Sequence, residues 1–177
     1  WLRPERGEIT FQTQQAGALT VTRDGDLLAL DFPARPPAPC AMSEPLVAAL
    51  GRRPGALLAA RDYLAVYDSA DAIEALRPDF AAVAALDRFA VIVTAPGTGG
   101  VDFVSRFFAP ARGVDEDPVT GSAHCTLIPY WAERLGKNRL EARQLSRRGG
   151  ALSCALRGDR VTIAGRALLY LEGAITV

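Results

Sequence analysis

A single ten-residue stretch, residues 115–124, carries the side chains best suited to chemistry. It reads Asp-Glu-Asp-Pro-Val-Thr-Gly-Ser-Ala-His, so three carboxylates precede a proline, and small and hydroxyl residues follow. Carboxylates can carry or accept protons, and the helix-like pattern that begins next supplies backbone N–H groups that bind anions. An ordinary surface loop needs neither property. The stretch therefore indicates one half of an active site.

The element that follows this stretch is predicted to be a helix over residues 121–135. Its apolar residues recur on one face, and Gly136 suits its C-terminal end. Pro129 lies inside the helix and predicts a kink or a free carbonyl group. The apolar residues of this face are Ala123, Leu127, Ile128, Trp131 and Leu135.

Most of the remaining chain has the apolar–polar alternation that predicts strands. An antiparallel meander is expected over residues 8–32, and a C-terminal strand over residues 167–177. Ser43 and Gly51 have the residue types that cap the two ends of a short helix. Many antiparallel strands with one long apolar helix predict an α+β fold, in which a sheet wraps around that helix. The other expected strands cover residues 55–60, 63–67, 89–95, 102–108, 140–146, 151–156 and 160–163, and two more short helices cover residues 71–76 and 79–86.

Composition excludes several classes of function. The 177 residues carry no net charge, which gives no electrostatic case for a nucleic acid or an anionic membrane as partner. One histidine and three widely spaced cysteines fit neither a metal site nor a disulfide framework. Reduced thiols and the absence of a long apolar run predict a cytoplasmic protein that needs no metal.

Several ordered motifs, taken together, resemble the PhzF (phenazine biosynthesis) family. They are the runs over residues 102–110, 116–124 and 129–131, then residues 144–150 and 158–161, together with the opening runs over residues 9–13, 17–19 and 31–34. The resemblance implies a diaminopimelate epimerase-like fold, with two similar domains that each wrap a barrel-like sheet around a central helix. It implies a cofactor-independent isomerase or epimerase, a homodimer, and a small substrate that bears a carboxylate.

The resemblance also assigns roles inside the stretch. Asp117 is the catalytic acidic residue, and Thr120, Gly121 and Ser122 bind the substrate. Physical arguments agree, because Gly121 lets a ligand approach the backbone and Ser122 offers a hydroxyl and an N–H group at a helix start. The alternative is that Asp117 and Ser122 only cap the helix.

Other reactive side chains near this stretch have plainer interpretations. His124 is expected to pack or hydrogen-bond along the helix, and Cys125 to be a buried, inert thiol. Arg106 is expected to be paired or solvated, although it could reach a substrate carboxylate. Trp131 is expected in the core.

One departure from the family pattern concerns the other half of the site. The family's catalytic glutamate lies upstream of the motif that begins here at Ile9, and Glu5 and Glu8 stand in the wrong context to replace it. We therefore expect residues 1–39 to be the end of a first domain with a proline-rich linker, and residues 40–177 a second domain whose last strand could return to the first. The chain alone is then expected to be inactive and to expose apolar strand edges. The alternative is a non-catalytic fragment or pseudoenzyme that binds a small anion or a partner chain.

Overall fold

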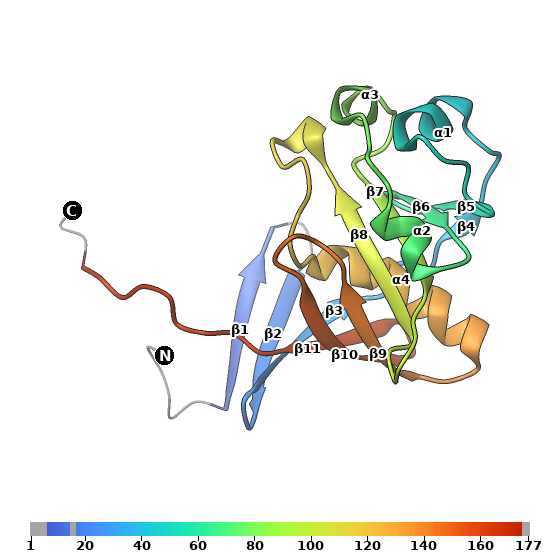
Figure 1. The fold of residues 1–177 in the computed structure, drawn as a ribbon. Helices are drawn as coiled ribbons and strands as arrows, with labels where there is room; N and C mark the ends of the chain where they lie inside the picture. Colours follow the sequence, from blue (N-terminus) through green and yellow to red (C-terminus); the bar gives the residue numbers. More distant parts are fainter. Residues whose placement is uncertain (1–6, 15–16, 175–177) are drawn as a thin grey trace.

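The structure is a computed structural model that describes residues 7–14 and 17–174. Its centre is one mixed sheet of eleven strands (Figure 1). The strands, in chain order, are β1 (Glu8–Thr13), β2 (Gly17–Asp24), β3 (Leu27–Pro33), β4 (Ala38–Pro39), β5 (Ala56–Ala59), β6 (Tyr63–Val66), β7 (Val91–Pro96), β8 (Phe103–Phe108), β9 (Arg139–Gln144), β10 (Gly150–Arg157) and β11 (Arg160–Gly165).

Two parallel pairings give the sheet its mixed character. The strand order is β1-β2-β3-β11-β10-β9-β8-β7-β6-β5-β4. Neighbours are antiparallel except β6–β7 and β8–β9. The pairing of β8 with β9 matters most for the site, because it places Ser105 beside Gln144 although they are far apart in sequence.

The long helix α4 (Gly121–Leu135) packs against one face of this sheet. Its predicted bounds are confirmed. Gly136 ends the helix in the left-handed conformation that glycine adopts readily, with φ 65°. Trp131 is fully enclosed, stacks on Phe103 of β8, and donates a hydrogen bond from its indole nitrogen to Thr94 Oγ1 at 2.9 Å. The main core therefore lies between α4 and the face of the sheet that strands β6 to β11 form.

Three short helices cover the opposite face of the sheet near β5 to β8. They are α1 (Glu44–Leu50), α2 (Ala70–Glu74) and α3 (Phe80–Ala84). Alternate residues of a strand point to opposite faces, so β8 sends Phe103 and Phe107 toward α4, and Val104 and Phe108 into the second core. The sheet thus separates two apolar layers.

Local signals explain why the helix ends were predictable. Ser43 accepts a hydrogen bond from the N–H of Leu46, and Gly51 closes α1 with φ 70°, both as expected. The meander of β1, β2 and β3 is likewise confirmed.

The predicted C-terminal strand over residues 167–177 is wrong for its described part, residues 167–174. This segment has no regular secondary structure and extends away from the body of the protein (Figure 1). Leu168 and Tyr170 are more than nine-tenths exposed. A strand needs a neighbour to accept its backbone hydrogen bonds, and no other described segment runs beside this one. Residues 175–177 lie outside the described residues.

The proline-rich segment leads from β3 to β4, which lies at the edge of the sheet. Proline has no backbone N–H group to donate, and an edge strand tolerates this loss. One sheet runs through both parts of the chain, since β3 pairs with β11. The division into domains at residue 39 stays a prediction.

Candidate active site

The stretch singled out in the sequence forms the loop between β8 and α4. A 3₁₀ turn, η1 (Pro110–Arg112), opens this loop, and a bridge between Ala109 and Val114 closes its base. The backbone N–H of Asp117 then donates to the carbonyl of Phe107 at 3.1 Å. These contacts turn the chain back along β8, so that Asp117 arrives directly before the first turn of α4.

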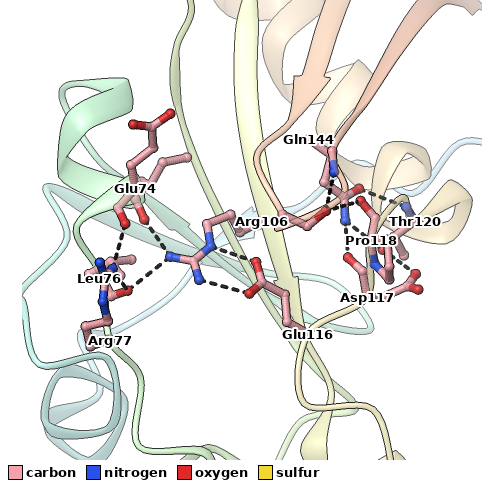
Figure 2. A network of polar contacts seen from close by, with 12 residues as sticks. Glu74, Leu76, Arg77, Arg106, Glu116, Asp117, Pro118, Thr120 and Gln144 are labelled. Atoms are coloured by element: carbon pink, nitrogen blue, oxygen red, sulfur yellow. Dashed lines mark hydrogen bonds and ion pairs between the residues drawn. The ribbon is translucent and has the colours of Figure 1, made fainter.

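Arg106 fixes the acidic part of the loop (Figure 2). Its guanidinium binds both carboxylate oxygens of Glu116, at 2.7 and 3.0 Å. Its Nη1 atom donates to the carbonyls of Ile73 and Leu76 at the end of α2, at 2.9 and 3.1 Å. Arg106 is 9% exposed, so this side chain is buried, and it is paired, which was one of the two expected states. It is therefore not free to bind a ligand.

Gln144, at the end of β9, holds the other side of the loop (Figure 2). Its Oε1 atom accepts from the N–H of Thr120 at 2.8 Å, and its Nε2 atom donates to the carbonyl of Asp117 at 2.6 Å. Nε2 also lies 3.1 Å from Thr120 Oγ1 and donates to it. One buried amide thus binds the backbone on both sides of the Asp117–Thr120 turn.

The candidate acid, Asp117, is partly exposed and close to the helix start. Thr120 Oγ1 donates to Asp117 Oδ2 at 2.6 Å. Thr120 is the N-cap residue of α4, but its side chain makes no capping hydrogen bond. Among the described residues, neither Asp117 nor Ser122 accepts a hydrogen bond from a helix N–H group, so neither side chain caps α4 in this structure. Their roles at the site stay predictions.

Ser122 lies in the first turn of α4, next to a fixed cation. Arg61, between β5 and β6, donates from Nη2 to Ser122 Oγ at 3.2 Å. The same guanidinium binds both oxygens of Asp62, which is fully buried, at 2.9 and 3.0 Å. It also stacks over the ring of Phe89, 4.3 Å from the ring centroid. Ser122 thus lies next to the guanidinium of the Arg61–Asp62 ion pair and in the first turn of a helix, whose start favours an anion.

Gly121 has room beside its backbone. A Cβ atom at this position would meet only Phe32, at 4.0 Å. Asp117, Gly121 and Ser122 line neither of two hollows on the described surface. The hollow of about 410 Å³ is lined by Glu116, Pro118, Ser146, Arg147 and Arg148. Asp117, Gly121 and Ser122 are partly exposed, whereas Thr120 is buried.

The burial and the pKa shifts of His124 and Cys125 do not suit acid–base catalysis. His124 is 0% exposed, its Nδ1 atom lies 2.8 Å from the carbonyl oxygen of Thr120, and burial lowers its pKa to about 4. Burial raises the pKa of the Cys125 thiol. The expected packing role of His124 and the expected burial of Cys125 are confirmed.

Two residues of this arrangement, Gln144 and Arg61, had not been selected as site residues from the sequence. A signal for Gln144 exists, because β9 alternates exposed and buried positions and Gln144 occupies a buried one, like Leu140 and Ala142. A polar residue at an inward position indicates a specific partner. Arg61 has no such signal, since Ser122 is 61 residues away in sequence.

Residues 7–14 and 17–174 contain neither a candidate metal site nor a candidate membrane span. No group of three or more histidine, cysteine, aspartate or glutamate side chains there could hold a metal ion. No helix in the same part of the chain is long and apolar enough to cross a membrane.

Comparison with known proteins identifies relatives of this chain. The family described as phenazine biosynthesis-like protein matches residues 6–173. An uncharacterized isomerase of Pseudomonas aeruginosa is 54% identical over 97% of this chain, which spans 66% of that protein. A crystal structure of a PhzF family protein from Enterococcus faecalis has a TM-score of 0.91 and 40% identity, over 97% of this chain and 66% of that one.

A more distant structure confirms the fold class. A predicted epimerase of P. aeruginosa superimposes with a TM-score of 0.65 at 17% identity, over 99% of this chain and 70% of the other. The α+β fold with a sheet around a central helix is therefore the fold of PhzF and epimerase-like proteins. The chain spans about two thirds of the length of the proteins it resembles.

Proposed function

Because this chain belongs to the PhzC-PhzF family of phenazine biosynthesis-like proteins, we propose that the complete protein is an isomerase or epimerase. It moves a proton on a small substrate that bears a carboxylate, and it needs no cofactor. The observation that carries the proposal is Asp117, a carboxylate held beside the uncapped start of α4.

The substrate carboxylate binds at the first turn of α4 in this proposal. Gly121 leaves space for it, and Ser122 and the N–H groups of the turn donate to it. Arg61 adds a positive charge that Asp62 and Phe89 hold in place. Negative charge that develops on the substrate as a proton leaves is stabilised by the same groups.

Asp117 carries or accepts the proton on one side of the substrate. A positioned acid or base contributes roughly 10²–10⁴-fold to a rate, which corresponds to about 3–5 kcal/mol. In this proposal a second such group serves the other position of the transferred proton. We place it, as a glutamate, in the part of the complete protein that this chain does not cover, since the relatives are about half as long again. The chain alone is accordingly inactive.

Exchange of a substrate C–H proton for solvent deuterium tests the proposal on the complete protein. A panel of small cyclic acids and amino acids in D₂O is followed by proton NMR. Exchange is expected for at least one compound, and Asp117→Asn should slow it roughly 10²–10⁴-fold. Asp115→Asn is the matched control, because Asp115 is exposed in the same loop and loses the same charge.

The outcomes separate the proposal from its rival. Exchange that survives in Asp117→Asn refutes the role of Asp117. No exchange with any compound, together with binding of a small carboxylate seen by calorimetry, would favour the non-catalytic anion-binding protein. Homodimer formation stays a prediction, which light scattering on the complete protein would test.

A further inference from the structure

A buried amide at the end of β9 needs an explanation. Gln144 is 1% exposed, and the neighbouring inward residues of its strand are Leu140 and Ala142. Burying an amide costs free energy unless each of its polar atoms finds a partner. Within the described part of the chain, the side chain of Gln144 meets this condition only through Asp117 and Thr120 (Figure 2).

The partners fix which way the amide faces. The N–H of Thr120 can only donate, so the atom 2.8 Å from it is the amide oxygen. The carbonyl of Asp117 can only accept, so the atom 2.6 Å from it is the amide nitrogen. The second hydrogen on that nitrogen is then directed at Thr120 Oγ1, 3.1 Å away. The backbone thus removes the ambiguity of an amide side chain.

The same logic fixes the hydrogen of the Thr120 hydroxyl. Its oxygen accepts from Gln144, and its own hydrogen is left for Asp117 Oδ2 at 2.6 Å. The three side chains form one directed chain of donors, from Gln144 through Thr120 to Asp117. Among the described residues, Oδ1 of Asp117 accepts no hydrogen bond, so one carboxylate oxygen is held and the other is open.

We propose that Gln144 is a positioning residue for the proton-transfer step, acting through the Thr120 hydroxyl that it turns toward Asp117. Thr120 then serves Asp117 instead of touching the substrate, and Asp117 works through Oδ1 alone. This inference rests on the proposed function, because it concerns the orientation of the proposed acid–base group.

Other contacts hold the loop independently of Gln144. Ser146 Oγ donates to the carbonyl of Pro118 at 2.8 Å and accepts from the N–H of Gly149 at 2.8 Å. Arg106 binds Glu116 on the other side of Asp117. Removal of the directed chain is therefore separable from loss of the loop.

Four variants of the complete protein test the inference in the deuterium exchange assay. Thr120→Val removes the hydroxyl at nearly constant shape, and Thr120→Ser keeps it. Gln144→Glu keeps the shape but takes away the donor, so that the Thr120 hydroxyl turns to the new carboxylate. Ser146→Ala is the matched control, because it loosens the same loop without touching the directed chain.

The expected pattern is a loss of kcat with little change in KM. One hydrogen bond to a charged group accounts for roughly 10- to 100-fold, which is the expected loss for Thr120→Val and for Gln144→Glu. Thr120→Ser should recover most of the rate, and Ser146→Ala should keep kcat within about threefold while lowering the melting temperature. The double variant Thr120→Val/Gln144→Glu should be no slower than the worse single variant, because both changes act through one hydroxyl.

Different failures have different meanings. If the unchanged protein exchanges and Asp117→Asn does not, but Thr120→Val and Gln144→Glu keep full rates, the positioning role is refuted alone. The positioning role would also be refuted if the kcat losses of the two single variants multiplied in the double variant, or if the substitutions changed KM instead of kcat. If the unchanged protein shows no exchange, the proposed function fails, and proton NMR still tests the geometry. A slowly exchanging Thr120 hydroxyl proton is expected, and its absence would overturn the directed chain.

Discussion

Replacement of His124 by asparagine is expected to make the folded protein more resistant to acid. His124 is the only histidine of this sequence, and its ring is fully buried against Phe103. Nδ1 donates to the carbonyl of Thr120, while Nε2 is buried and has no hydrogen-bond partner among the described residues. Asparagine can still donate to that carbonyl, and it does not titrate. The variant therefore removes the charge change and keeps the local hydrogen bond.

The size of the effect follows from the pKa. Burial lowers the pKa of His124 from 6.5 to about 4, against the opposing effect of the hydrogen bond to Thr120. His124 therefore becomes protonated below pH 6.5 in the unfolded chain, but only near pH 4 in the folded chain. Its titration does not affect the free energy of unfolding above pH 6.5. As the pH falls from 6.5 to about 4, the free energy of unfolding decreases by about 3 kcal/mol.

Urea unfolding of the unchanged protein and of His124→Asn, from pH 7.5 to pH 4, measures this loss. The carboxylates titrate in both proteins and cancel in the difference between them. The variant should start less stable at pH 7.5, since it loses ring packing, and should gain about 3 kcal/mol relative to the unchanged protein by pH 4. In melting temperature this gain is roughly 6–12 °C for a chain of this size. Two stability curves that stay parallel over this range would refute the reasoning.

Three further outcomes are expected. Arg106→Met or Glu116→Gln alone should lower the free energy of unfolding by about 3–5 kcal/mol, because each leaves a buried partner unpaired. In a double-mutant cycle measured by urea unfolding, the double variant should lose less than the sum of the two single losses, and additive losses would contradict the pairing. Gly150→Ala should slow deuterium exchange, because the new Cβ atom would lie 2.5 Å from Val119 Cγ2 and displace the loop that carries Asp117. The added substitution Val119→Ala should restore the rate, and a rate that stays low would exclude this contact as the cause. Burial raises the pKa of the Cys154 thiol to about 12, so mass spectrometry should find it unlabelled by iodoacetamide at pH 8 until the protein is unfolded, and rapid labelling in the folded state would contradict its burial.

The predictions that succeeded depended on signals that are local in the chain. Ser43 and Gly51 bracket α1 because a hydroxyl can accept from the first turn and glycine can adopt a left-handed end. The bounds of α4 were predictable from the apolar period and Gly136. The one strand that failed, after β11, had suitable residues but no neighbouring strand, and pairing is a property of the whole sheet.

In the candidate site, too, some features follow from neighbouring residues in the sequence and others only from tertiary contacts. The sequence alone determined that a carboxylate, Asp117, stands before a glycine and a serine at the start of a helix, because all these residues are neighbours in the chain. Only the tertiary structure decided what holds them: Gln144 reaches Thr120 across 24 residues, and Arg61 reaches Ser122 across 61. The pairing of β8 with β9, and the position of α4 beside the loop between β5 and β6, bring these groups together. Hydrogen bonds act over about 3 Å in space at any separation in the chain, so the folded sheet, and not local sequence, sets the orientation of the acid.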